Sequence, residues 1–295
     1  MKKILKTLIQ SSIGFTLIKL LKLICTPPIK YSKKLRFKGE FKVKTRIGNN
    51  FKLYNNAFHL ETHIFWLGID NYEWENKTRE IWCDLSEKSD TIFDIGANVG
   101  IFSVLAKANN PTAQVIAFEP QPNIFEILKT NNAINNFEIR CENIAISNKS
   151  GVVPFYNHGP NTFSDNNTTS GSLNKKWRPI DQDSIDIEVI TLRDYIETNS
   201  IETIDLLKID VETLEYEVLA GYGNFLLKQE PIIILEIQSI EIGSKIETLL
   251  TQDIYLYYAI DELKGLAKIN KLGKAVDNNY LLCPKRKVDL IKHLI

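Results

Sequence analysis

Cysteine is scarce in this sequence, and long apolar runs are missing. The 295 residues include four cysteines, Cys25, Cys83, Cys141 and Cys283, and no two of them form a C-x-x-C pair. This spacing argues against a disulfide framework and a zinc site, and it fits a reducing compartment such as the cytoplasm. An uncharged run over residues 7–18 is too short to span a membrane, which takes about 20 apolar residues.

The formal net charge is zero, but basic and acidic residues are distributed unevenly along the chain. Residues 1–46 carry thirteen Lys or Arg and one acid, Glu40, so the remaining residues carry 23 basic and 35 acidic side chains. We therefore expect three parts: a basic helical arm (1–34), a β-hairpin lead-in (35–71) and a main domain (72–295). The acidic body disfavours nucleic acid as a partner, because it repels phosphates.

The basic arm begins like a secretion signal but does not continue as one. Lys19 and Lys22 interrupt the uncharged run, and no small-residue cleavage site follows. Two interpretations stay open. Residues 1–25 make peripheral contact with anionic lipid on the inner face of the membrane, or they form a helix packed on the body or a partner. Pro27 and Pro28 end the helix in either case.

Strands and helices alternate through the main domain. Two alternating runs at 36–44 and 51–54 predict the hairpin, and residues 72–85 predict a helix with a core-facing stripe. Strands are expected at 91–95, 114–118, 137–141, 152–156, 185–190, 204–209, 232–237, 256–260 and 280–283. Helices are expected at 100–108, 123–133, 212–227 and 242–250. This order indicates βαβ units and a doubly wound, mostly parallel α/β sheet.

A glycine-lined turn follows the first strand of this alternation, in the sequence Asp-Ile-Gly-Ala-Asn-Val-Gly from Asp94 to Gly100. Gly96 and Gly100 allow a sharp turn and close approach to a ligand. Asn98 stands where a dinucleotide-binding loop needs glycine, which disfavours a nucleotide-linked dehydrogenase, and no P-loop lysine follows. Glu119 ends the next strand, where doubly wound folds bind a ribose. An acidic turn for an amino group and an acid for a ribose together describe S-adenosylmethionine.

These motifs resemble the FkbM family of methyltransferases. The resemblance runs from about residue 42 to 284 and includes Asp-Ile-Gly-Ala-Asn at 94–98 and Lys-Ile-Asp-Val-Glu at 208–212. It implies a Rossmann-like seven-stranded class I fold, S-adenosylmethionine as cofactor and O-methylation, often of sugars in surface glycans or of natural products. The residues expected to bind the cofactor are Glu73, Asp94, Gly96, Asn98, Gly100, Glu119, Pro120 and Asn143.

One position departs from the family pattern. The family usually has glycine after the acid at 212, and this chain has Thr213. A threonine at the start of a helix can cap it, so the fold is not threatened. We expect its side chain to narrow the acceptor pocket, which weakens any transfer of substrate identity from the family.

The acids after two later strands are candidates for the chemistry. Asp210 ends a strand beside the cofactor strand, and we expect it to act as general base or to orient the acceptor hydroxyl. Glu212 is the second choice, although acids in a first helical turn, Glu215 included, also complement the helix dipole. Glu236 is a third candidate. A divalent metal shared by Asp210 and Glu236 has no support in the sequence, and no metal site is predicted.

Other interpretations remain. A scaffold that keeps the cofactor fold without catalysis is one alternative, and a lipid-linked or natural-product acceptor is another. His59 and His63 lie four residues apart without the glutamate of a zinc-protease helix, and the strand patterning nearby argues against a helix there. The polar stretch 157–172 is either a lid over the substrate or a disordered insertion. Oligomeric state and acceptor identity are not predicted.

Overall fold

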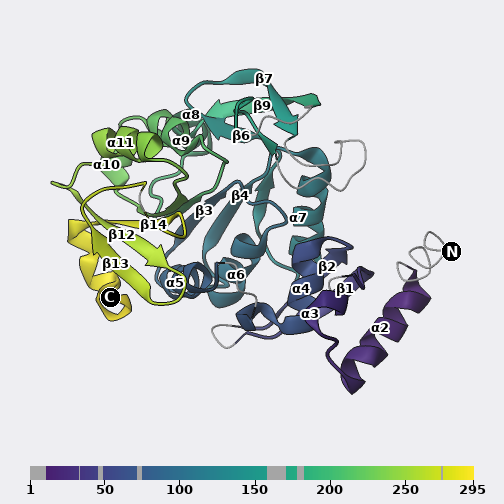
Figure 1. Cartoon of the computed structure of the whole chain (residues 1–295). Helices are drawn as coiled ribbons and strands as arrows, with labels where there is room; N and C mark the ends of the chain where they lie inside the picture. The colour runs from purple at the N-terminus through teal and green to yellow at the C-terminus, as the bar shows by residue number, and fades with distance from the viewer. Residues whose placement is uncertain are drawn as a thin grey trace.

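A computed structural model of the chain describes residues 11–32, 34–45, 49–71, 75–157, 171–177, 183–273 and 275–295. Its centre is a large mixed β-sheet with helices on both faces (Figure 1). One face carries α5 (Asn76–Ser86), α6 (Ile101–Asn109) and α7 (Pro122–Ile134). The other carries α8 (Leu192–Asn199), α9 (Glu215–Tyr222), α10 (Phe225–Gln229) and α11 (Ile240–Leu249). These three layers confirm the doubly wound α/β fold.

The large sheet has the strand order β13-β12-β14-β11-β10-β3-β4-β5. Its strands are β3 (Thr91–Ile95), β4 (Gln114–Phe118), β5 (Arg140–Glu142), β10 (Leu206–Ile209), β11 (Ile232–Glu236), β12 (Tyr255–Asp261), β13 (Gly265–Ile269) and β14 (Asn279–Pro284). The five strands from β11 to β5 are parallel, and β14 is antiparallel to both neighbours. The predicted seven-stranded sheet is present, with β13 added as an eighth strand at its edge.

The strand order reverses between β3 and β10. The chain runs outward from β3 through β4 to β5 and then returns to build β10 and β11 on the other side of β3. Ligands of doubly wound sheets bind beyond the carboxyl ends of the strands at such a reversal. The fold therefore directs attention to the loops that follow β3, β4, β10 and β11.

Successive residues of the central strands face opposite layers. Ile92 and Leu206 belong to the hydrophobic cluster under α5 to α7, whereas Phe93 and Leu207 belong to the cluster under α8 to α11. All four are fully buried. Because both faces of these strands are buried, their sequences are continuous apolar runs and do not alternate between apolar and polar residues.

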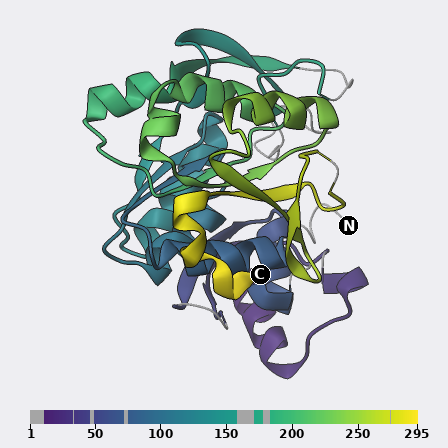
Figure 2. The same cartoon turned by 90° about the vertical axis from the view of Figure 1, so that its left-hand side faces the viewer.

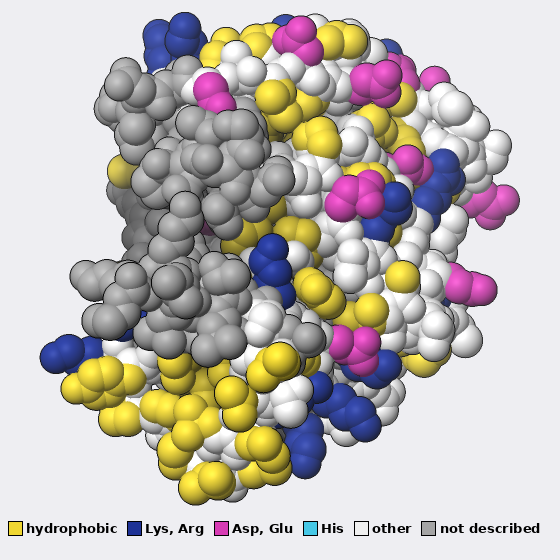
Figure 3. Space-filling view, turned by 90° about the vertical axis from the view of Figure 1, so that its right-hand side faces the viewer, with side chains coloured by type: hydrophobic (Ala, Val, Ile, Leu, Met, Phe, Trp, Pro, Cys, Tyr) yellow, Lys and Arg dark blue, Asp and Glu magenta, His cyan; other side chains and the backbone are white. Residues whose placement is uncertain are grey.

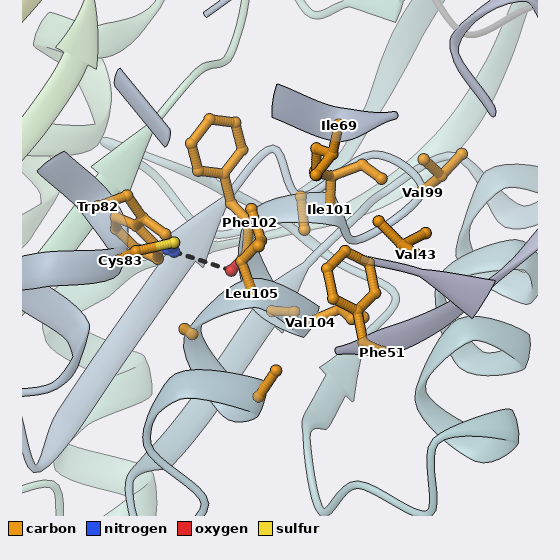
Figure 4. Packing of buried hydrophobic residues seen from close by; sticks show 14 of the residues in the cluster. Val43, Phe51, Ile69, Trp82, Cys83, Val99, Ile101, Phe102, Val104 and Leu105 are labelled. Atoms are coloured by element: carbon orange, nitrogen blue, oxygen red, sulfur yellow. Dashed lines mark hydrogen bonds between the residues drawn. The ribbon is translucent and has the colours of Figure 1, made fainter. Parts of the chain in front are cut away.

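The first cluster draws together segments far apart in the sequence (Figure 4). Trp82 from α5 meets the ring of Phe102 edge-on, with centroids 5.7 Å apart, and its Nε1 donates to the Phe102 carbonyl at 2.8 Å. Val43 and Phe51 from the N-terminal hairpin reach the same cluster. The core-facing stripe predicted for residues 72–85 is confirmed in α5, while Trp74 lies outside the described residues.

The hairpin is confirmed as β1 (Lys38–Val43) and β2 (Phe51–Asn56), which pair antiparallel, and residues 46–48 of its turn lie outside the described residues. Side chains of α7 satisfy one edge of β2. Asn135 Oδ1 accepts from the Lys52 amide at 2.7 Å, and Asn131 Oδ1 accepts from the Tyr54 amide at 2.8 Å. Helices α2 (Ser12–Ile24) and α3 (Ile29–Ser32) precede the hairpin along the lower edge of the molecule (Figures 1 and 2).

The argument against a helix around His59 is wrong. Helix α4 spans His59–Leu67, and Gly68, with φ 84°, ends it before a short 3₁₀ turn, η1 (Ile69–Asn71). Ile64, Phe65 and Trp66 are all buried along it. Tertiary burial of these side chains outweighs the local alternation, which is a weak guide over so few residues.

Several predicted strands form a separate sheet. It has the order β6-β9-β7-β8, from β6 (Ala145–Ser147), β7 (Gly151–Asn157), β8 (Gly171–Ser172) and β9 (Ser184–Thr191). Residues 158–170 of the polar stretch lie outside the described residues. The predicted helix 212–227 is instead α9 and α10, divided at Gly223, where φ is 62°. Two 3₁₀ turns, η3 (Lys285–Leu290) and η4 (Lys292–Leu294), complete the elements.

Candidate active site

Two cavities open where the strand order reverses. The larger has a volume of about 700 Å³ and the smaller about 120 Å³. Gly96, Asn98, Asp210 and Glu212 line both cavities. The two spaces therefore meet at the loops that follow β3 and β10.

Glycine at position 96 is required by packing against the loop after β10. Gly96 has φ 80°, and a Cβ there would lie 1.9 Å from the carbonyl oxygen of Asp210. Its amide and that of Ala97 both donate to the carbonyl of Phe118, at 3.0 and 2.9 Å. Asn98 also has positive φ, 52°, a conformation that asparagine tolerates. The predicted turn thus brings the ends of β3, β4 and β10 into contact.

Glu119 secures this turn from the end of β4. Its carboxylate accepts the Asn98 amide at 2.9 Å and the Gln121 amide at 2.8 Å. Burial raises the pKa of Glu119 to about 7, although both amide hydrogen bonds oppose that shift. A carboxylate has about four acceptor positions, so two remain for hydroxyl groups of a ligand. Glu119 and Pro120 line the small cavity, whose walls include the apolar side chains of Ile144, Ile146 and Phe155.

Three of the predicted cofactor-binding residues line neither cavity. Asp94 is fully buried and accepts from the Ser103 hydroxyl at 2.5 Å, and burial raises its pKa. Gly100 begins α6 with φ 86°, at a point where a Cβ would lie 2.4 Å from Leu128. Asn143 donates to the carbonyls of Glu119 and Pro120 at 2.8 and 3.0 Å. Their geometry suits support of the binding loops better than direct contact.

Asp210 stands at the junction of the two cavities. Lys208 Nζ pairs with Asp210 Oδ2 at 3.0 Å and lies 4.5 Å from the ring centre of Phe102. Lys208 is 5% exposed and Asp210 32% exposed. Burial alone would lower the pKa of Lys208, but Asp210, Glu75 and Asp94 together raise it above its ordinary value. Lys208 therefore stays charged and fixes the carboxylate of Asp210 at the rim.

The other two predicted catalytic acids share one donor. Gln238 Nε2 donates to Glu212 Oε2 and to Glu236 Oε2, both at 2.9 Å. The indole Nε1 of Trp177 donates to Gln238 Oε1 at 2.9 Å, which fixes the orientation of the amide. Gln238 thereby joins Glu212 to Glu236, and all three residues line the larger cavity. Gln238 and Trp177 were missed, because no local pattern marks a glutamine that bridges two acids.

The loop between β10 and α9 is strained, and Thr213 does not behave as predicted. Glu212 and Thr213 have φ values of 55° and 80°, which threonine rarely adopts. A glycine at position 213 would adopt this conformation without strain. Thr213 does not cap α9, which starts at Glu215 after Leu214, and it lines neither cavity. Instead, Thr213 Oγ1 accepts from Asn174 Nδ2 at 2.7 Å.

Glu215 organises the same loop from its buried position at the start of α9. Its Oε1 accepts from the amides of Val211 and Thr213 at 3.4 and 3.1 Å. Burial raises the pKa of Glu215 to about 8. Ser172 also stabilises this loop, because its hydroxyl donates to the Glu212 carbonyl at 3.0 Å.

The outer wall of the larger cavity comes from segments before and after the alternating core. Glu61 on α4 is fully buried, and neither of its carboxylate oxygens has a hydrogen-bond partner among the described residues. Burial raises its pKa to about 7. Glu75, just before α5, also has a pKa of about 7, because burial outweighs the opposing charge of Lys208. Both residues line the cavity and were missed. Glu73, which was predicted to bind the cofactor, lies outside the described residues.

The histidines do not form a zinc site of the protease type. His59 and His63 lie one helical turn apart on α4 with ring centres 3.9 Å apart, and only His59 lines the larger cavity. Within the described ranges, no three His, Cys, Asp or Glu side chains are grouped so that they could hold a metal ion. All four cysteines are free thiols, and the two on α5 and β14 are buried.

Comparison with known proteins identifies the domain that carries this site. Residues 94–257, more than half of the chain, match the model of the methyltransferase FkbM domain. The 31-O-demethyl-FK506 methyltransferase FkbM of Streptomyces tacrolimicus is 33% identical over 153 residues, which are 45% of this chain and 59% of that protein. The hexuronic acid methyltransferase AglP of Haloferax volcanii is 27% identical over 154 residues, covering 52% of this chain and 58% of that protein.

A crystal structure titled methyltransferase FkbM, from Methylobacillus flagellatus, matches 66% of this chain and 43% of its own at 15% identity, with a TM-score of 0.36. The chain spans 58–59% of the length of the two curated relatives above. The family match takes in the glycine turn, Glu119, and the acids that follow β10 and β11. The chain therefore belongs to the FkbM family of S-adenosylmethionine-dependent methyltransferases.

Proposed function

We propose that this protein methylates a hydroxyl group on a sugar, a glycan or a related small polar molecule, with S-adenosylmethionine as methyl donor. The observation that carries this proposal is the meeting of two cavities at one rim, inside the matched family domain. The smaller space suits a nucleoside and the larger one an acceptor. Their shared rim, at Asp210 and Gly96, is where the methyl group would pass.

The donor set of the small cavity fits the cofactor. A carboxylate such as Glu119 accepts hydrogen bonds from both hydroxyls of a ribose, and the apolar wall formed by Ile144, Ile146 and Phe155 suits a flat adenine ring. When bound, S-adenosylmethionine supplies an electrophilic methyl group on a sulfonium centre. The turn at Gly96 and Asn98 would hold its amino acid end.

Asp210 would orient the acceptor hydroxyl and accept its proton as the new bond forms. Lys208 holds the Asp210 carboxylate in place through Oδ2. Positioning of the two reactants contributes about 7–11 kcal/mol in favourable cases, while a placed base adds about 10²–10⁴-fold. Glu212 is the second choice for binding the hydroxyl and Glu236 the third, and Gln238 joins the two.

The charge of the larger cavity favours a neutral polyhydroxylated acceptor. Seven acidic side chains line it, against two basic ones, Arg79 and Lys208. Carboxylates accept hydrogen bonds from hydroxyls and repel other anions, so an anionic acceptor like the hexuronic acid of the Haloferax relative fits this cavity poorly.

Isotope-labelled cofactor tests the proposal. Purified protein is incubated with deuteromethyl-labelled S-adenosylmethionine and glycans from cells that lack the gene, and mass spectrometry follows the label. We expect one labelled methyl group on neutral sugar residues and none on uronic acids. Tight cofactor binding without label transfer to any glycan, lipid or small-molecule fraction would contradict an enzymatic role and favour a scaffold. Label on a natural product or a lipid would replace the acceptor proposed here.

A further inference from the structure

We infer that the outer face of helix α2 docks this protein on an anionic membrane surface. The inner face of α2 packs on the body. Ile18 is 5% exposed, and Phe15 stacks on Phe37 with ring centres 4.8 Å apart. Lys22 donates to the Phe65 carbonyl and lies over the Phe65 ring. These contacts hold the inner face of α2 against Phe37 and against α4.

The outer face of α2 is an apolar stripe. Ile13, Leu17, Leu20 and Ile24 are 66%, 56%, 52% and 83% exposed, and their spacing places them on one side of the helix. Twelve large apolar side chains are exposed in the described part of the chain, and six of them fall within residues 13–31. Such a concentration marks an interaction surface, since scattered exposed apolar residues are ordinary but contiguous ones are not.

The charged residues around the stripe indicate that it binds an anionic surface. Lys19, Lys30, Lys34, Arg36 and Lys38 are all exposed, on α2 and on the segment that follows it. The one acid of residues 1–46, Glu40, is paired with Lys52 at 2.9 Å. Figure 3 looks toward this side of the molecule, where hydrophobic side chains gather along the lower edge and Lys and Arg lie at their border.

An apolar stripe bordered by cations is the pattern of a helix that lies in the membrane interface, with its apolar side in the acyl boundary and its lysines at anionic headgroups. A symmetric pair of chains would bury the stripe equally well, but it would also bring the two sets of lysines together, which is unfavourable. No helix in the described ranges is long and apolar enough to cross a bilayer.

Docking would leave the active site unobstructed. No residue of α2 lines either cavity. The inference therefore does not rest on the proposed acceptor, and membrane binding and turnover can be measured separately.

Vesicle sedimentation tests the inference with the full chain. The protein is mixed with vesicles of phosphatidylcholine and phosphatidylserine, and with vesicles of phosphatidylcholine alone. We expect binding to the anionic vesicles that weakens as salt is added. The double variant Leu17→Gln/Leu20→Gln should bind about tenfold more weakly or worse, because interfacial affinity scales with buried apolar area. The control Val152→Gln/Leu227→Gln changes two exposed apolar residues elsewhere and should bind like the parent.

Circular dichroism and thermal unfolding establish that both variants are folded, which is expected because the altered side chains are exposed. Equal binding by the two double variants would overturn the inference, as would equal binding to neutral and anionic vesicles. A dimer that the α2 variant dissociates, without vesicle binding by the parent, would also overturn it and assign the stripe to a second copy of the chain.

Discussion

The two cavities differ in where their walls come from. Every residue that lines the small cavity falls between Ile95 and Leu214, inside the matched family domain. About half of the lining of the large cavity comes from outside that domain, from α4, from the start of α5 and from residues 262–279. Under the proposed assignment, the cofactor would be bound by residues of the matched domain, while about half of the acceptor wall would come from segments outside it.

Such a division would allow one methyl donor to serve different acceptors. A cofactor common to a family requires a constant set of loops, and these are the loops at the strand reversal. Acceptor identity can change through elements added around them, which is how one fold supports many specificities. Variants at the junction, in the small cavity and in the large cavity should therefore have separable effects.

The largest effect is expected at the junction, from Asp210→Asn. The amide cannot accept a proton, so turnover should fall by about 10²–10⁴-fold while cofactor affinity persists. Stopped assays with labelled cofactor give turnover, and calorimetry gives affinity. Asp253→Asn, an exposed acid that lines neither cavity, is the matched control. Unchanged turnover in Asp210→Asn would mean that this residue is not the base.

Glu119→Gln should act on the small cavity alone. Hydrogen bonds to a charged group contribute about 1.5–3 kcal/mol, so affinity for S-adenosylhomocysteine should fall about tenfold to a hundredfold with little change in the acceptor KM. Glu138→Gln, an exposed acid, serves as control.

If Glu119 contacts the ribose, the effect of Glu119→Gln should be coupled to the effect of removing a ribose hydroxyl. A purely structural role of Glu119 predicts no such coupling. The parent should lose affinity for 2′-deoxy and 3′-deoxy analogues of the product cofactor, and Glu119→Gln should lose little further. If the variant discriminates against the deoxy analogues as strongly as the parent, Glu119 only supports the glycine turn through Asn98 and Gln121.

Glu61→Gln tests the buried carboxyl of the large cavity through stability. The pKa of Glu61 is raised to about 7 in the folded protein, so its neutral form is favoured there, and the resulting contribution to stability is lost as pH rises from about 4.5 through 7. Glutamine does not ionise. The variant should therefore gain about 2 kcal/mol on the parent between pH 5 and pH 8, measured by urea unfolding.

Glu87→Gln, at an exposed position after α5, serves as the matched control. A constant difference between Glu61→Gln and the parent across this pH range would indicate that Glu61 is ionised throughout, with a partner supplied by the cavity.

The parts of the structure that the sequence predicts correctly are those in which the local backbone requires particular residue types. Buried parallel strands need continuous apolar runs, so the bounds of β3 and β4 agree with prediction. The turn at Gly96 needs a residue without Cβ, and its motif was visible for that reason. The candidate acids after β10 and β11 follow from the same logic, because they end strands that meet at one edge of the sheet.

Features that depend on contacts between residues far apart in the sequence could not be predicted from it. Nothing near Gln238 indicates that its amide joins Glu212 to Glu236, since these residues meet only after β10 and β11 pair. Glu61 sits in a helix that local alternation argued against, and its burial depends on packing of the whole lead-in. The left-handed backbone of Thr213 is imposed by Glu215 and Asn174, and propensity alone predicts the opposite.

The smallest effect should come from Gln238→Ala, which removes the bridge without removing an acid. Glu212 and Glu236 would lose a shared donor while both acids remain, so kcat/KM should fall about fivefold, which is about 1 kcal/mol in the barrier, with cofactor affinity unchanged. Gln238→Glu should be worse than alanine, because it adds a third carboxylate beside two others. Gln252→Ala, at an exposed amide that donates to the Asn270 carbonyl, controls for loss of a glutamine. If alanine and glutamate behave alike, the two acids do not depend on the bridge, and the large cavity is organised from Asp210 and Lys208 alone.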